Sequence, residues 1–344
     1  MAIVPRRTLA AALGALAVLG VGACGGTSSP PAGPATPAAA SAGEQGPWTW
    51  TDDRGKNISL PHRPQRVVAQ FDSAAALWDF GLRPVALFGP HRLKDGSRDR
   101  AVGEVDITKV ESVGNAFGEF NVEKYASLQP DLMVAGMYEK NSLWYVPKEL
   151  TEAVDQVAPS VGVQLSGRPL VEIIEKYGEL AAALGADQKA ASVVEAKNRF
   201  DAAGAALKAL AAARPDLKIM IVAGTPDGLY VAYLPDHPDI TYWGDQLGLN
   251  VVYPPKPSEG GFWELVSWEN ADKYQADAIL VDARAASMKI EEMAKKPTWA
   301  KLPAVKAGQL YPWRAAERYS YLGYAQVMEE LKANLDKARD DVVK

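Results

Sequence analysis

The segment from Asn121 to Asp131, NVEKYASLQPD, is followed at once by the apolar run Leu132–Ala135. Asparagine is a favoured residue at the start of a helix, because its side-chain oxygen can accept a hydrogen bond from a free backbone N–H. A short and wholly apolar run after a helix is typical of a strand that is buried on both faces. The segment therefore predicts a helix over 122–128 and a buried strand over 131–135.

A second segment of the same kind, SWENADKYQAD, begins 146 residues later at Ser267 and precedes the apolar run 278–281. The glutamate, glutamine and aspartate of the first segment all recur at this offset, and serine is again a good helix-capping residue. Upstream, Phe80-Gly81-Leu82 and Leu247-Gly248-Leu249 also correspond, because each ends a predicted helix before a predicted strand. We therefore expect two lobes of one topology, with an extra loop at about 91–114 in the first.

Strands and helices alternate along the rest of the chain, as in an α/β protein with parallel sheets. The expected strands are 66–70, 85–88, 131–135 and 161–165 in the first lobe, and 217–223, 229–234, 251–253, 278–281 and 308–311 in the second. An Ala-rich helix over 187–213 has few large apolar residues, which favours a bridge between lobes over a core helix. The expected domains are an N-terminal lobe over 48–186, an interlobe helix over 187–213, and a C-terminal lobe over 214–344 with a closing helix.

The N-terminus has the pattern of an export signal. Met1–Arg7 is basic, and Thr8–Ala23 is an apolar run too short to span a bilayer comfortably. Val21-Gly22-Ala23-Cys24 follows and resembles the lipobox of bacterial lipoproteins, whose cysteine carries a lipid. We expect a lipoprotein signal peptide over 1–23.

The next segment, 24–47, then consists of the lipidated Cys24 and a flexible tether rich in Gly, Pro and Ala. A signal peptide whose cleavage region happens to contain cysteine is the alternative. The pair Arg6-Arg7 leaves Sec and twin-arginine export both open.

Composition and motifs exclude several functions. The chain has 344 residues, a formal net charge of −5 and no long basic run, so we expect no nucleic-acid partner. It has no dinucleotide-binding glycine motif, no P-loop and no nucleophile elbow, and Cys24 is its single thiol. The three histidines have no metal-ligand spacing. We therefore expect neither an enzyme, nor a resident cofactor, nor a metal held by protein ligands.

Several aromatic residues follow predicted strand ends, where α/β proteins bind their ligands. Each of them taken singly is more often a core residue, but two glycines precede Phe262-Trp263, and an arginine follows Trp313. Neither glycine nor arginine suits a core. The candidate ligand-binding residues are Tyr138, Trp144, Trp263, Trp313 and Arg314.

Glu123 and Glu269 occupy equivalent positions, each in the first turn of a predicted helix. One interpretation is stabilisation of the helix dipole by an acidic residue. The other is a pair of docking points, one on each lobe, for a two-fold symmetric partner with basic pockets. The residues alone favour the first interpretation.

The order of these motifs resembles the class III periplasmic-binding-protein family, the siderophore, haem and cobalamin receptors of ABC importers. The resemblance covers about 48–340 and rests on Thr51–Gly55, Pro64–Val68, Asn121-Val-Glu123 and Val266-Ser-Trp-Glu269. It implies an α/β fold of two Rossmann-like lobes with central parallel sheets, joined by one long α-helix, with the ligand cleft between the lobes. It also implies that Glu123 and Glu269 meet arginines of the permease, which reverses the preference stated above.

Phe262-Trp263 and Tyr138 resemble the aromatic contacts of hydroxamate-siderophore receptors in this family. The expected protein is thus a monomeric lipoprotein, anchored to the outer face of the cell membrane through Cys24. It would capture a preformed ferric siderophore, of a hydroxamate type such as a ferrioxamine, and deliver it to an ABC permease dimer. The alternatives are a cobalamin or haem receptor of the same fold, an extracellular α/β hydrolase, and a non-catalytic adhesion or signalling lipoprotein.

Overall fold

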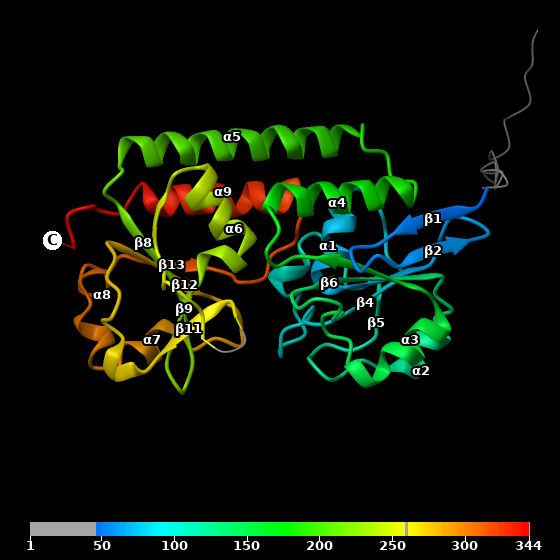
Figure 1. The fold of residues 1–344 in the computed structure, drawn as a ribbon, viewed down its shortest axis with the longest axis horizontal. Helices are drawn as coiled ribbons and strands as arrows, with labels where there is room; N and C mark the ends of the chain where they lie inside the picture. Colours follow the sequence, from blue (N-terminus) through cyan, green and yellow to red (C-terminus); the bar gives the residue numbers. More distant parts are fainter. Residues whose placement is uncertain (1–45, 259–260, 344) are drawn as a thin grey trace, which may run out of the picture. The chain divides into compact units, whose positions relative to one another are not determined.

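The computed structural model describes residues 46–258 and 261–343, and its strands form three sheets (Figure 1). Cys24, the expected signal peptide and nearly all of the expected tether lie outside the described residues. The first sheet is a small hairpin, in which β1 (Trp48–Thr51) pairs with β2 (Asn57–Leu60) in antiparallel fashion.

The N-terminal lobe contains a five-stranded sheet that is parallel throughout, in the order β5-β4-β3-β6-β7. Every residue of β3 and β6 is buried, as expected for a parallel sheet covered on both faces. The strands are β3 (Val67–Gln70), β4 (Ala86–Phe88), β5 (Glu111–Ser112), β6 (Leu132–Met137) and β7 (Ser160–Gln164). The helices are α1 (Phe71–Asp79), α2 (Val122–Ser127), α3 (Thr151–Val157) and α4 (Leu170–Ala183).

The C-terminal lobe has a six-stranded sheet with the expected parallel strands at its centre and an antiparallel pair added to them. β10, β8, β12 and β13 are parallel neighbours in the same order as β4, β3, β6 and β7 of the first lobe, so the two lobes share this core topology. β9 and β11 add antiparallel pairs beside β8. The strands are β8 (Lys218–Gly224), β9 (Leu229–Ala232), β10 (Asn250–Val252), β11 (Trp263–Val266), β12 (Ala278–Asp282) and β13 (Leu310–Trp313).

The helices of this lobe are mostly short, apart from the closing helix. They are α6 (Pro238–Thr241), which continues as a π-helical turn over Tyr242–Gln246, then α7 (Ile290–Met293), α8 (Pro303–Lys306) and α9 (Tyr321–Leu335). None of the helices among the described residues is long and apolar enough to cross a membrane.

One long helix, α5 (Ala191–Ala213), connects the lobes and runs beside α9 (Figure 1). It begins four residues later than expected, because Asp187 accepts a hydrogen bond from the backbone N–H of Lys189 in a separate turn, and Ala190 precedes the helix. Arg199 of α5 holds Glu329 of α9 through two hydrogen bonds of 2.5 and 2.6 Å. The interlobe helix is thus fixed to the closing helix.

The matched segments differ in one respect from the expected pattern. Asn121 caps α2 through a 2.8 Å hydrogen bond from the Lys124 N–H, whereas the matching helix expected after Ser267 is a single 3-10 turn, Trp268–Asn270. The Trp268 side chain is buried, and its indole donates to the Thr225 carbonyl at 3.1 Å. Because the Trp268 side chain is held inside the lobe, the backbone stays in this 3-10 turn and does not continue as a helix.

The two lobes also meet through a buried ion pair. Arg318, which precedes α9, donates to Asp79 of α1 at 2.6 Å, and the two side chains are only 4% and 3% exposed. Ser320 donates to the same carboxylate oxygen at 2.6 Å. A Cβ atom at Gly103, where φ is +52°, would lie 2.7 Å from the Arg318 side chain, so glycine is required for this close approach.

Candidate ligand-binding cavity

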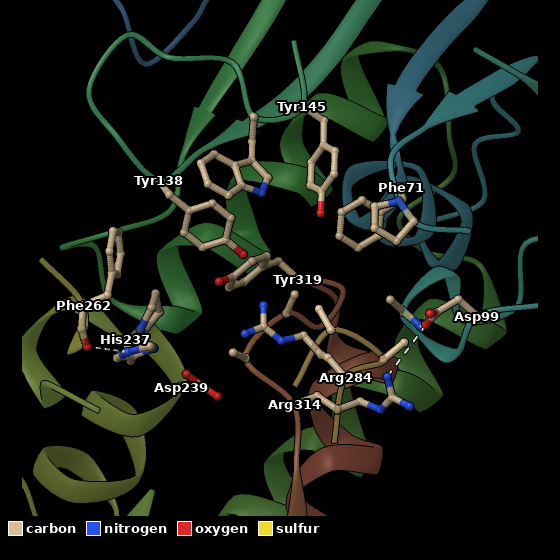
Figure 2. A pocket seen from close by; sticks show the side chains of 18 of the residues that line it. Phe71, Asp99, Tyr138, Tyr145, His237, Asp239, Phe262, Arg284, Arg314 and Tyr319 are labelled. Carbon is tan, nitrogen blue, oxygen red and sulfur yellow. Dashed lines mark hydrogen bonds and ion pairs between the residues drawn. The ribbon is translucent and has the colours of Figure 1, made fainter. Parts of the chain in front are cut away.

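A cavity of about 330 Å³ lies between the lobes, within the usual size range of small-molecule sites. The residues around it follow the carboxyl ends of strands in both lobes: Phe71 follows β3, Tyr138 follows β6, Arg284 follows β12 and Arg314 follows β13. Figure 2 shows these side chains arranged around one space. In α/β proteins, ligands bind beyond the carboxyl ends of the strands.

Four of the five predicted ligand-binding residues line this cavity: Tyr138, Trp144, Trp263 and Arg314. Trp313 does not; it is 5% exposed and lies behind the wall of the cavity. Its indole N–H donates to Asp239 at 3.1 Å, and its ring centroid lies 6.1 Å from that of Trp263. Trp313 therefore supports two wall residues.

Aromatic rings form a continuous wall that passes from one lobe to the other. The Tyr138 ring lies 5.3 Å from Trp144 of its own lobe and 6.0 Å from Phe262 of the other. Tyr145 and Phe262 have left-handed backbone conformations, with φ of +66° and +63°. A left-handed backbone conformation is unfavourable for bulky residues and persists only where the surrounding structure maintains it. Its occurrence at Tyr145 and Phe262 indicates that the protein holds these two rings in place at the cavity.

Each arginine at the cavity has an acidic partner. The Nε of Arg284 donates to the buried Asp282 at 2.8 Å, which aims the rest of the guanidinium toward Tyr319 in Figure 2. Arg314 forms an ion pair of 3.7 Å with Asp99 of the other lobe. Both cations can still donate hydrogen bonds to a ligand, but their charges are largely balanced.

Two further carboxylates, Asp236 and Asp239, line the C-terminal side of the cavity. Burial raises the pKa of Asp239 to about 6, although the indole of Trp313 and backbone N–H groups oppose this shift. Burial also lowers the pKa of His237 to about 4, so its imidazole is neutral at pH 7; one ring nitrogen lies 2.9 Å from the Phe262 carbonyl. Desolvation raises the pKa of the Tyr138 hydroxyl, which therefore stays protonated as a hydrogen-bond donor.

The sequence interpretation missed Arg284, His237 and Asp239. Arg284 stands just past the apolar run 278–281, so the rule that selected Arg314 could have found it. His237 and Asp239 are separated from the short strand β9 by the 3-10 turn Leu234–Asp236, and no local sequence pattern distinguishes them.

Glu123 and Glu269 lie outside the cavity, and both are exposed. Glu123 is in the first turn of α2, and Glu269 is in the 3-10 turn that follows β11. Hydrogen bonds from its own backbone N–H and from Ser267 lower the pKa of Glu269, so it is ionised at neutral pH. α2 and the end of β11 both lie far from α5 in Figure 1.

Comparison with known families gives a match over residues 91–317 to a model described as periplasmic binding protein. The chain belongs to the periplasmic binding protein family. It is therefore a binding protein and not an enzyme.

Several individual proteins resemble it over most of their length. The crystal structure of DesE, a ferric-siderophore receptor protein from Streptomyces coelicolor, matches with a TM-score of 0.81 and 38% identity, covering 86% of this chain and 99% of that one. The Fe(3+)-citrate-binding protein YfmC of Bacillus subtilis is 24% identical over 262 residues, 76% of each chain. SirA of Staphylococcus aureus, solved with staphyloferrin B, shares the fold at a TM-score of 0.60 and 19% identity, covering 85% and 99%.

Proposed function

We propose that this protein is the substrate-binding component of an ABC importer and that it captures a ferric siderophore outside the cytoplasm. Its similarity to DesE, a ferric-siderophore receptor, supports this class of ligand. An aromatic cavity between two lobes is also suited to a bulky chelate, because rigid rings bury much apolar surface at little entropic cost. The chelator occupies all six positions of the iron, so no protein atom ligates the metal.

We further propose that the chelate is of the hydroxamate type. The observation that carries this proposal is the charge of the cavity: Arg284 and Arg314 are matched by Asp282 and Asp99, and carboxylates remain beyond these pairs. Ferric tris-hydroxamates are neutral or cationic, whereas ferric catecholates and ferric citrate carry negative charge. A cavity without excess positive charge favours the former, since like charges brought together in an interface cost several kcal/mol.

Delivery to the permease would use Glu123 and Glu269, one exposed carboxylate on each lobe. We propose that they pair with basic pockets of a permease dimer. We also propose that the protein is anchored to the outer face of the cell membrane through a lipid on Cys24, which rests on the sequence around that cysteine. The tether up to residue 47 would allow the lobes to reach the permease.

Replacing Trp263 by alanine should weaken binding of a ferric hydroxamate by about 1–3 kcal/mol, because apolar burial and ring contact are both lost. The measurement is a tryptophan-fluorescence titration of the full-length chain in mild detergent with ferrioxamine. Trp78→Ala is the matched control, since Trp78 is a half-buried tryptophan of α1 outside the cavity wall. Unchanged affinity in Trp263→Ala, or an equal loss in both variants, would contradict the proposed site.

A further inference from the structure

The carboxylates of the cavity differ in whether a cationic side chain of the protein pairs with them. Asp99 is engaged by Arg314 at 3.7 Å, and its other contacts include the Ala101 N–H at 2.9 Å. Among the ion pairs of the described residues, none includes Asp236 or Asp239. The C-terminal wall thus presents two carboxylates whose charge the protein itself does not balance.

Asp239 is the more deeply placed of the two, at 6% exposure. Its hydrogen-bond partners are neutral: the Trp313 indole at 3.1 Å and backbone N–H groups. A buried carboxylate without a cationic partner lowers the stability of the protein, because desolvation is only partly offset. A cation supplied by a ligand would remove this cost on binding.

The surroundings of Asp239 suit an alkylammonium group. The indole N–H of Trp313 donates to Asp239, and the centroid of the Trp313 ring lies 6.0 Å from that of His237. The centroid of the His237 ring in turn lies 4.8 Å from that of Trp263. Aromatic faces attract cations and also cover the methylene groups of an amine-bearing chain. Figure 2 shows Asp239 beside His237, on the opposite side of the cavity from the Arg314–Asp99 pair. A cation bound at Asp239 therefore need not approach Arg314.

We propose that Asp239, assisted by Asp236, binds a protonated primary amine carried by the ligand, so that this protein selects ferric hydroxamates with a cationic chain end over neutral ones. The inference rests on the proposed function and specifies its ligand class. Arg284 and Tyr138, on other parts of the wall, remain available for the chelate oxygens.

The proposal also predicts how the preference changes with pH. Asp239 is ionised above about pH 6, and a bound ammonium lowers its pKa further. The preference for the amine therefore has its full size well above pH 6 and declines as the pH falls through about 6. Among the titratable groups near Asp239, His237 is neutral down to about pH 4, and burial keeps Tyr138, Tyr319 and Tyr324 protonated. Burial raises the pKa of Asp72 and of Glu317, which interact with these tyrosines, to about 7, so the Asp239→Asn variant is needed to separate their titration from that of Asp239.

The test compares two probes with the same iron coordination: ferrioxamine B, which has a free terminal amine, and its N-acetyl derivative. Affinities are measured by fluorescence titration of the full-length chain at pH 7.5 and pH 5. At pH 7.5 the wild type should bind the amine form at least about tenfold more tightly, and at pH 5 this ratio should fall. In Asp239→Asn, which keeps an oxygen for the Trp313 indole, the ratio should be within about twofold at both pH values.

Asp216→Asn is the control, since it removes an equal charge from an exposed site next to the amino end of β8, opposite the cavity edge of that sheet. It should keep the wild-type ratio. Equal binding of the two probes by the wild type would overturn this inference alone and leave the proposed function intact. A wild-type ratio retained in Asp239→Asn would overturn the role of Asp239. Failure of the wild type to bind either probe would overturn both proposals.

Discussion

Replacing both Glu123 and Glu269 by arginine should abolish uptake of the iron chelate, while the affinity of the purified protein for the chelate should change by less than about twofold. Both carboxylates are exposed and lie outside the cavity, so the substitutions leave the binding wall intact. At the permease, two attractive pairs would become like-charge contacts, each costing several kcal/mol. The measurement is uptake of radioactive ferric iron, as its ferrioxamine complex, by cells that express the variant at the wild-type level.

The control is the double variant Glu195→Arg/Asp216→Arg, which changes the net charge equally. Glu195 is an exposed residue of α5, and Asp216 is exposed beside the amino end of β8, so neither is near Glu123 or Glu269. Its uptake should be normal. Normal uptake by the Glu123/Glu269 variant would remove the docking role, and a large loss of chelate affinity would show that these residues act on the cavity.

Replacing Arg318 by methionine should lower the free energy of unfolding by about 3–5 kcal/mol, the cost of leaving one member of a buried ion pair alone. Asp79 would keep only the Ser320 hydroxyl at 2.6 Å, in a place where the side chain is 3% exposed. Burial already raises the pKa of Asp79 while Arg318 lowers it. Without Arg318 the pKa rises further, so the loss should be greatest at neutral pH and shrink in acid, where the carboxylate binds a proton. Urea unfolding at two pH values measures both effects.

The double variant Asp79→Leu/Arg318→Met distinguishes this explanation from simple loss of packing. Removing both charges should recover a large part of the stability, since no charge is then left buried. A double variant as unstable as Arg318→Met alone would mean that the arginine acts through its packing between Gly103 and Gly323.

Much of the fold could be predicted because its signals are local. Buried parallel strands such as β6 and β12 are short apolar runs, and Asn121 caps α2 by a bond to a residue three positions away. The expected helix after Ser267 failed because Trp268 finds its partners in distant parts of the lobe, Thr225 and Trp299. Local propensity yields to such tertiary contacts.

The cavity was predictable in part for a similar reason. Tyr138 and Arg314 directly follow β6 and β13, where sequence order already indicates ligand contact. Trp263 is a candidate because two glycines precede Phe262-Trp263, and it is the first residue of β11. Trp313 satisfies the strand-end rule, yet its side chain is buried behind the wall of the cavity, where its indole donates to Asp239. The pairing of Arg314 with Asp99 joins segments that are far apart in the sequence, and no spacing in the sequence reveals it.

The most direct test of the account is a titration of the full-length wild-type chain with ferrioxamine, a ferric catecholate, ferric citrate, haem and cobalamin, following tryptophan emission. Free N-acetyltryptophanamide corrects for light absorbed by each compound. Ferrioxamine should quench the emission saturably at one chelate per chain, with Trp144 and Trp263 in the cavity wall, and should bind more tightly than its iron-free form. The anionic chelates should bind at least about 100-fold more weakly. No saturable quenching by ferrioxamine, or tighter binding of the catecholate, ferric citrate, haem or cobalamin, would contradict the account.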